Sequence, residues 1–198
     1  MSKPALPPLL TFTPLLVPKV WGGRRLKGWG KALPEGAIGE SWELADLPGD
    51  GPVSVVDAGS LKDRTLRSLL EAHETAIMGH VPLDGAGRFP LLIKFLDACS
   101  NLSVQVHPDE AWVRCHSDHH LKSEAWLVLE ADPGSLIHAG LRPGMTTARL
   151  ASAVNDGSTE RILRSVPARQ GDCHTLVSGT CHALGAGVLV AEVQTSSD

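Results

Sequence analysis

Short runs of β-prone residues, each ended by Gly, Pro, Asp or Ser, recur from residue 89 onward. They read FPLLIKFLDA, LSVQVH, EAWLVLEA, SLIHAG, CHTLVSG and GAGVLVAEVQ. Runs of this length between turn-forming residues are typical of short β-strands. Helical segments are few and do not alternate regularly with these runs, which argues against a parallel, doubly wound sheet. We therefore predict a mainly β fold, an antiparallel barrel or jelly roll.

Helical spacing is confined to a few short segments. In TLRSLLEAHETAI, Leu66, Leu69, Leu70 and Ile77 recur at the helical interval, and TTARLASAVNDG and STERILRSV predict shorter helical pieces. No repeat or linker divides the 198 residues. We expect one domain over 1–198, with lead-in strands over about 1–60, a helix over about 64–78 and a β core over about 88–198.

Charge and hydropathy exclude several classes of partner. The net charge is −4 and no Lys/Arg block exceeds two residues, which argues against nucleic acid and anionic membrane surfaces. The N-terminal ALPPLLTFTPLLV lacks the features of a signal peptide, and no run approaches the roughly 18 apolar residues of a membrane span. The four cysteines form no C-x-x-C pair, so we expect free, buried thiols. These features favour a cytoplasmic protein with small-molecule ligands.

The stretch LSVQVHP (102–108) alternates between apolar and polar side chains. Successive residues of a strand point to opposite faces, so positions 102, 104 and 106 form an apolar row facing a core, and Ser103, Gln105 and His107 form a polar row. A solvated face would explain this row. A ligand-lined face would also explain it, but requires polar partners elsewhere in the chain.

Such partners occur in two later segments. In KSEAWLVLEA, Lys122, Glu124 and Trp126 share one face, and SGTCHALGAG places His182 in a Gly-rich turn before a strand that carries Glu192. Zinc accepts a mixture of imidazole, carboxylate and amide-oxygen ligands and keeps an open position in catalytic sites. We therefore predict one zinc ion, with the ligands Gln105, His107, Glu124 and His182.

A second histidine cluster is a weaker metal candidate. His116, His119 and His120 lie close together in CHSDHHL, but in a polar connection without strand geometry to fix their positions. We do not expect these residues to bind a metal.

Six segments in order resemble the type I mannose-6-phosphate isomerases, in particular their short bacterial form. These segments are VWGG (20–23), IGESWEL (38–44), FPLLIKFLDA (89–98), LSVQVHPD (102–109), KSEAWLVLEA (122–131) and SGTCHALGAGVLVAEVQTSSD (178–198). The resemblance implies a cupin-type jelly roll that binds zinc and interconverts mannose 6-phosphate and fructose 6-phosphate.

The resemblance also implies roles for individual residues. The same four residues would bind zinc, Lys122 would take part in proton transfer beside the substrate, and Glu192 would be an acidic residue of the same pocket. Lys94 and Ser103 match positions near the substrate phosphate.

This isomerisation moves a proton between C1 and C2 of the open-chain sugar through an enediol. A divalent cation holds the two oxygens on these carbons and stabilises the negative charge that develops there.

Family members continue beyond the position that matches Asp198, into an arginine-bearing segment and a further β domain. We therefore expect the 198-residue chain to bind zinc and to isomerise poorly or not at all. We also expect it to self-associate through an apolar surface or sheet edge exposed at the strand of Glu192. Two alternatives stay open. One is a non-catalytic sugar-phosphate-binding cupin, and the other is a metal-dependent cupin oxygenase with iron, which Gln105 disfavours.

Overall fold

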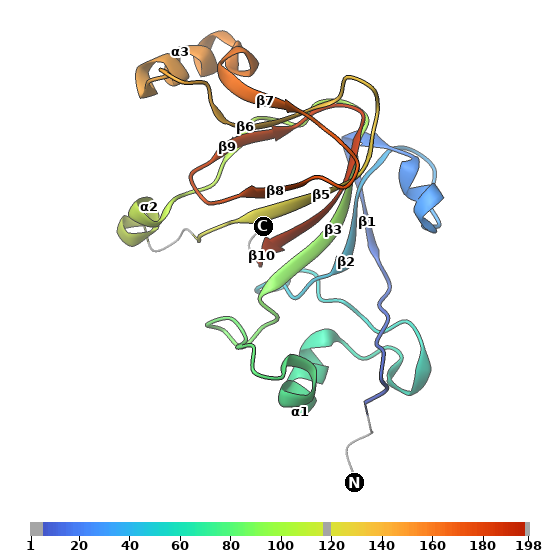
Figure 1. The fold of residues 1–198 in the computed structure, drawn as a ribbon. Helices are drawn as coiled ribbons and strands as arrows, with labels where there is room; N and C mark the ends of the chain where they lie inside the picture. Colours follow the sequence, from blue (N-terminus) through green and yellow to red (C-terminus); the bar gives the residue numbers. More distant parts are fainter. Residues whose placement is uncertain (1–5, 117–119, 197–198) are drawn as a thin grey trace.

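Two antiparallel sheets lie face to face in this computed structural model, which describes residues 6–116 and 120–196 (Figure 1). The larger sheet has the strand order β1-β2-β3-β10-β5-β8, and the smaller has the order β4-β9-β6-β7. The prediction of a mainly β fold with antiparallel sheets is confirmed.

The strands are short, as the frequent turn residues predicted. The large sheet consists of β1 (Leu15–Gly23), β2 (Ile38–Leu44), β3 (Leu91–Ala98), β10 (Val188–Thr195), β5 (Glu124–Ala131) and β8 (Cys173–Leu176). The small sheet consists of β4 (Gln105–Val106), β9 (Cys181–Leu184), β6 (Leu136–Leu141) and β7 (Leu163–Pro167).

Helices are few in the described part of the chain. The α-helices are α1 (Leu66–Met78), α2 (Glu110–Cys115) and α3 (Thr147–Asp156), and the 3-10 helices are η1 (Arg25–Trp29), η2 (Gly59–Leu61) and η3 (Thr159–Ile162). Both α1 and α2 begin with a side-chain cap, because Thr65 accepts a hydrogen bond from the Ser68 amide and Asp109 from the Trp112 amide. Among the described helices, none is both long enough and apolar enough to cross a membrane.

The main apolar core lies between the two sheets. Its buried members come from strands of both sheets and are Leu96, Ala98, Trp126, Val128, Ile137, Leu176, Leu184, Val188 and Val190. The last two belong to β10, on which Glu192 and Gln194 continue the same inward row and are also buried. The strand thus carries an apolar row that changes to a polar row along its length.

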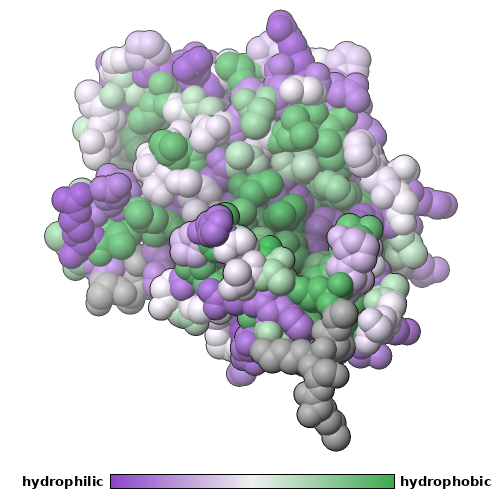
Figure 2. All heavy atoms as spheres, turned by 60° about the horizontal axis from the view of Figure 1, so that its bottom comes forward, coloured by the Kyte–Doolittle hydropathy of each residue, from purple (hydrophilic) through white to green (hydrophobic). Residues whose placement is uncertain are grey.

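Strand β10 pairs with β3 on one side and with β5 on the other. The predicted exposed edge at the strand of Glu192 is therefore wrong, because both sides of that strand are hydrogen-bonded. On the outer face, Leu127 is 42% and Val193 37% exposed. The surface view in Figure 2 shows a mixed face on which apolar groups gather near the centre, bordered by hydrophilic ones. Self-association stays a prediction.

Two local expectations from the sequence are wrong. The predicted strand over 102–107 pairs only at Gln105 and Val106, and Val106 is 59% exposed because the chain then turns away from the sheet toward α2. The four cysteines are free, but only Cys181 is buried. The other three lie at exposed positions at or near the ends of β3, α2 and β8.

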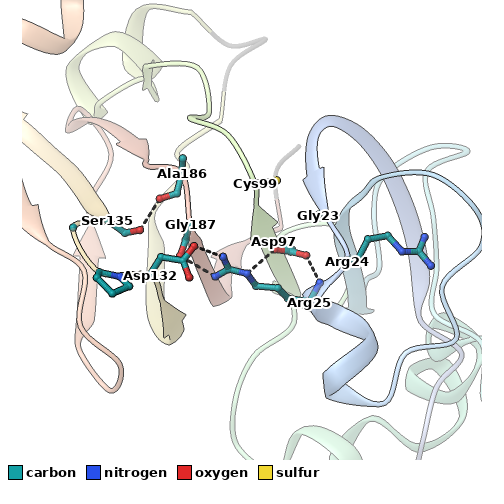
Figure 3. Close-up of a pocket in the computed structure, with 11 residues that line it drawn as sticks. Gly23, Arg24, Arg25, Asp97, Cys99, Asp132, Ser135, Ala186 and Gly187 are labelled. Atoms are coloured by element: carbon teal, nitrogen blue, oxygen red, sulfur yellow. Dashed lines mark hydrogen bonds and ion pairs between the residues drawn. The ribbon is translucent and has the colours of Figure 1, made fainter.

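Arg25 connects three segments that are far apart in the sequence (Figure 3). Its backbone amide donates to Asp97 of β3 at 2.7 Å, and its guanidinium donates to the Gly187 carbonyl at 2.9 Å and to Asp132. Asp97 is only 1% exposed, and its burial raises the pKa of its carboxyl group despite the contacts with Arg25. These residues line a cavity of about 420 Å³.

Replacing Arg25 with Leu should lower the free energy of unfolding by about 2 kcal/mol, because it removes the charged partner of a buried carboxylate and a donor to Gly187. Urea unfolding followed by tryptophan fluorescence measures this loss. Arg24→Leu is the matched control, since its guanidinium donates to the carbonyls of Pro34 and Gly36, which are near in the sequence. Equal losses for the two variants would contradict the long-range role of Arg25.

Candidate metal centre

Three potential metal ligands converge from three different segments. Glu124 is the first residue of β5, His182 lies in β9, and His107 directly follows β4. Their ligand atoms all lie within 4.8 Å of one another. Glu124 is 4% and His182 2% exposed, and His107 is half-buried. The fold thus brings together three of the four predicted zinc ligands.

Glu124 is the centre of this group. Its Oε1 lies 3.1 Å from His107 Nε2 and 3.3 Å from Lys122 Nζ, and its Oε2 lies 3.5 Å from His182 Nε2. Burial acts to raise the pKa of Glu124. The contacts with the two imidazoles and the charge of Lys122 outweigh burial and hold the pKa well below its usual range. The carboxylate is therefore ionised at neutral pH, as a metal ligand must be.

The orientation of His182 fits a bound cation. Its Nδ1 lies 2.8 Å from the Thr180 carbonyl, and because a carbonyl only accepts, this contact assigns the proton to Nδ1. In the neutral ring, Nε2 then carries the lone pair. This buried atom has no hydrogen-bond partner among the described residues and faces the Glu124 carboxylate. A histidine whose second nitrogen donates to a carbonyl is typical of metal ligands.

Gln105 lies beside this triad. It is directly opposite His182 in the β4–β9 ladder, and directly opposed residues of an antiparallel pair project to the same side. Its Nε2 lies 3.4 Å from the Ser103 hydroxyl. The ligand role of Gln105 stays a prediction, with its place on the His182 side of the ladder in its favour.

The second histidine cluster lies elsewhere. The half-buried His116 ring stacks on Trp112 with ring centroids 4.0 Å apart, and His120 is exposed. His119 lies outside the described residues.

A cavity of about 300 Å³ adjoins Glu124 and is lined by most of the predicted site residues. Of these it includes Lys94, Ser103, Gln105, Lys122, Glu124 and Glu192, and it adds Lys19, Trp21, Glu40, Leu96, Leu102 and Trp126. The larger cavity at Arg25 shares no lining residue with it. The predicted site residues therefore gather around the smaller of the two cavities.

A network of charged side chains, most of them buried, forms part of the wall of this cavity. Lys94 Nζ lies 3.2 Å from Glu192 and 4.0 Å from Glu40, and Lys19 Nζ lies 3.1 Å from Glu40. Burial raises the pKa of Glu192, against the opposing effect of Lys94. The indole of Trp126 donates to Glu192 at 2.9 Å. This carboxyl group can therefore hold or accept a proton within the cavity.

Our reading of the sequence missed Glu40, Lys19 and Trp21. A signal was present for Glu40, because Glu40 and Trp42 alternate with smaller or exposed residues in IGESWEL and share the inward face of β2. Trp42 donates to Glu40 at 2.6 Å and pairs across the sheet with Lys94. The alternation that placed Glu124 and Trp126 on one face also places Glu40 and Trp42 on one face of β2.

Replacing His107 with Ala should abolish stoichiometric zinc binding, because the remaining donors no longer surround one position. Metal content after dialysis against buffered zinc measures this loss. His116→Ala is the matched control, since its ring stacks on Trp112 and does not belong to the triad. Full zinc content in the His107 variant would remove the triad as the metal site.

Zinc stabilisation should depend on pH through His182. Burial acts to lower the pKa of His182, but its contacts with Glu124 and the Thr180 carbonyl outweigh burial and raise the pKa above the usual 6.5. In the metal-free protein this contribution to stability is fully present below 6.5 and is lost as pH rises through the folded value. Zinc binds the neutral ring of His182, so zinc affinity increases as pH rises.

We therefore expect the rise in melting temperature caused by zinc to be small at about pH 6 and to grow steadily above 6.5. Differential scanning calorimetry with and without zinc measures it. An increase in melting temperature that stays constant across this range would count against imidazole ligation.

Comparison with known proteins finds a family model and related proteins that match most of this chain. The family model "Phosphomannose isomerase type I, catalytic domain" matches residues 10–128. Mannose-6-phosphate isomerase ManA of Bacillus subtilis is 36% identical over 190 residues, which cover 96% of this chain and 58% of that protein. The mannose-6-phosphate isomerase of Streptococcus mutans is 38% identical over 181 residues, which cover 91% and 55%.

A solved structure of a protein with the same name has a similar fold. The mannose 6-phosphate isomerase of Bacillus subtilis superposes with a TM-score of 0.82 at 35% identity, over 96% of this chain and 59% of that one. The predicted cupin fold is thereby confirmed. The chain spans somewhat more than half the length of the curated relatives it matches. Because the family model matches more than half of the residues of this chain, the chain belongs to the type I phosphomannose isomerase family.

Proposed function

We propose that this chain forms the metal centre and substrate cavity of an isomerase that interconverts mannose 6-phosphate and fructose 6-phosphate. The observation that carries the proposal is the His107–Glu124–His182 triad beside a cavity that Lys122 and Glu192 line. Family membership supports the same reaction.

Zinc is the proposed metal, one ion held by His107, Glu124 and His182 with Gln105 as the fourth ligand. Two imidazoles, a carboxylate and an amide oxygen are donors that zinc accepts. When bound, zinc would supply positive charge that stabilises negative charge on the carbonyl and hydroxyl oxygens of the open-chain sugar.

The protein groups around the cavity suit proton transfer between C1 and C2. Lys122 Nζ is 3.3 Å from Glu124, so it lies at the edge of the metal site and is proposed to move the proton through an enediol. Glu192, whose pKa burial raises, is proposed as a second acid–base group of the cavity, on the neighbouring strand β10. Trp126 and Lys94 hold its carboxyl group in place.

The formal charges of the cavity favour a phosphorylated sugar over a neutral one. Among the described residues its lining includes three lysines and three glutamates, whose charges cancel. A divalent cation would add two positive charges, which a phosphate monoester dianion balances. Ser103 and Lys94 are proposed to lie on the phosphate side of the substrate.

Two rival functions predict different observations. Two histidines and one carboxylate also form the iron site of non-haem oxygenases, so metal analysis that finds iron in place of zinc would favour that class. Incubation with mannose 6-phosphate, with fructose 6-phosphate formation as the readout, tests the isomerase directly. Saturable sugar-phosphate binding without turnover would instead indicate a non-catalytic binding cupin.

Replacing Lys122 with Met should lower kcat by about 10²- to 10⁴-fold and leave zinc content unchanged, because it removes a proton-transfer group but no metal ligand. A coupled isomerase assay and metal analysis measure the two quantities. Lys62→Met is the control, since Lys62 is an exposed lysine outside the cavity. An unchanged kcat in the Lys122 variant would remove its proposed role.

A further inference from the structure

We infer that Lys19 is a further substrate-binding residue, whose ammonium group meets the phosphate of the sugar at the open side of the cavity. This inference rests on the proposed function and adds to the site a residue from the irregular part of the β1–β2 pairing, which we call the crossing of β1 and β2. Two of the segments singled out in the sequence, VWGG and IGESWEL, meet at that crossing.

The backbone of β1 leaves its ladder where Lys19 occurs. Pro18 and Gly23 both pair with Ile38 of β2, so the four residues between them lie outside the regular pairing. Val20 in this segment is fully exposed to solvent, whereas its neighbours Lys19 and Trp21 line the cavity. The irregular segment thus turns one lysine and one tryptophan inward.

Two glycines make this crossing possible. A Cβ atom at Gly22 would lie 2.4 Å from the Gly39 amide nitrogen, and one at Gly39 would lie 2.5 Å from Cβ of Lys19. Such distances are too short for any larger residue without a backbone shift. The Trp21 carbonyl also accepts a hydrogen bond from the Cys99 amide at 2.8 Å. Lys19 is therefore carried on a closely packed and anchored backbone.

Among the three lysines that line the cavity, Lys19 is the best placed to meet a ligand that enters from solvent. Its side chain is 36% exposed, compared with 6% for Lys94 and 13% for Lys122. Lys94 lies between two buried carboxylates, and Lys122 lies beside Glu124. The charges of both are largely balanced before a substrate arrives.

The ion pair between Lys19 and Glu40 can also break at a small cost in free energy. Its ion pair is with Glu40, which accepts a hydrogen bond from Trp42 at 2.6 Å and faces Lys94 as well. Glu40 therefore keeps a hydrogen bond and a cation when Lys19 turns to the ligand. A phosphate dianion offers Lys19 a stronger charge-assisted hydrogen bond than a carboxylate that two other groups already share.

The test is binding of mannitol 6-phosphate, which has no carbonyl group and cannot be isomerised, to the zinc-loaded chain by titration calorimetry. Lys19→Gln should weaken binding by about 10- to 100-fold, because one charge-assisted hydrogen bond is lost. Lys19→Arg should stay within about threefold of the original protein, since it keeps the charge. In the isomerase assay, Lys19→Gln should raise KM and leave kcat nearly unchanged, as expected for loss of uniform binding.

Lys27→Gln is the matched control, because it makes the same charge change at an exposed position of η1. Lys19→Gln binding within twofold of the original, or equal weakening in the Lys27 variant, overturns the role of Lys19 and leaves the proposed function intact. If the unaltered chain binds mannitol 6-phosphate no better than mannitol, the sugar-phosphate function fails, and the role of Lys19 fails with it.

Discussion

The arrangement around the candidate metal centre depends on one buried carboxylate. Glu124 is 4% exposed and ionised, and a buried charge is costly unless it is paired. Two imidazoles from two other segments and the ammonium group of Lys122, two residues before it, surround it. The requirement to compensate this charge explains why β4, β5 and β9 meet where they do. A divalent cation would meet the same requirement more completely.

Much of the site could be predicted from residue periodicity. Alternation in KSEAWLVLEA placed Glu124 and Trp126 on one inward face, and the structure has both buried. The strand at LSVQVH was predicted too long, because periodicity does not show that the chain turns toward α2 after two paired residues. Glu40 was missed although the same period of two places it on an inward face. Lys19 was missed because its role depends on Glu40 and Lys94, which only strand pairing brings near.

The two cavities show why the volume of a pocket alone is a poor guide to function. The cavity at Arg25 is the larger, but Arg25 already pairs with the carboxylates of Asp97 and Asp132. The smaller cavity gathers buried groups of both charges together with indole donors. Perturbed carboxyl groups at Glu124 and Glu192, shifted in opposite directions on neighbouring strands, set this site apart.

The position of β10 has a consequence for folding. Strands β3 and β5 do not pair with each other, because β10 lies between them, although residues 188–195 are synthesised after both. Until that segment leaves the ribosome, each neighbour presents an open edge to the solvent. Closure of the sheet requires contacts across long stretches of chain, which slows folding and prolongs exposure to aggregation. Nascent chains of this protein should therefore depend on chaperones until the last strand is inserted.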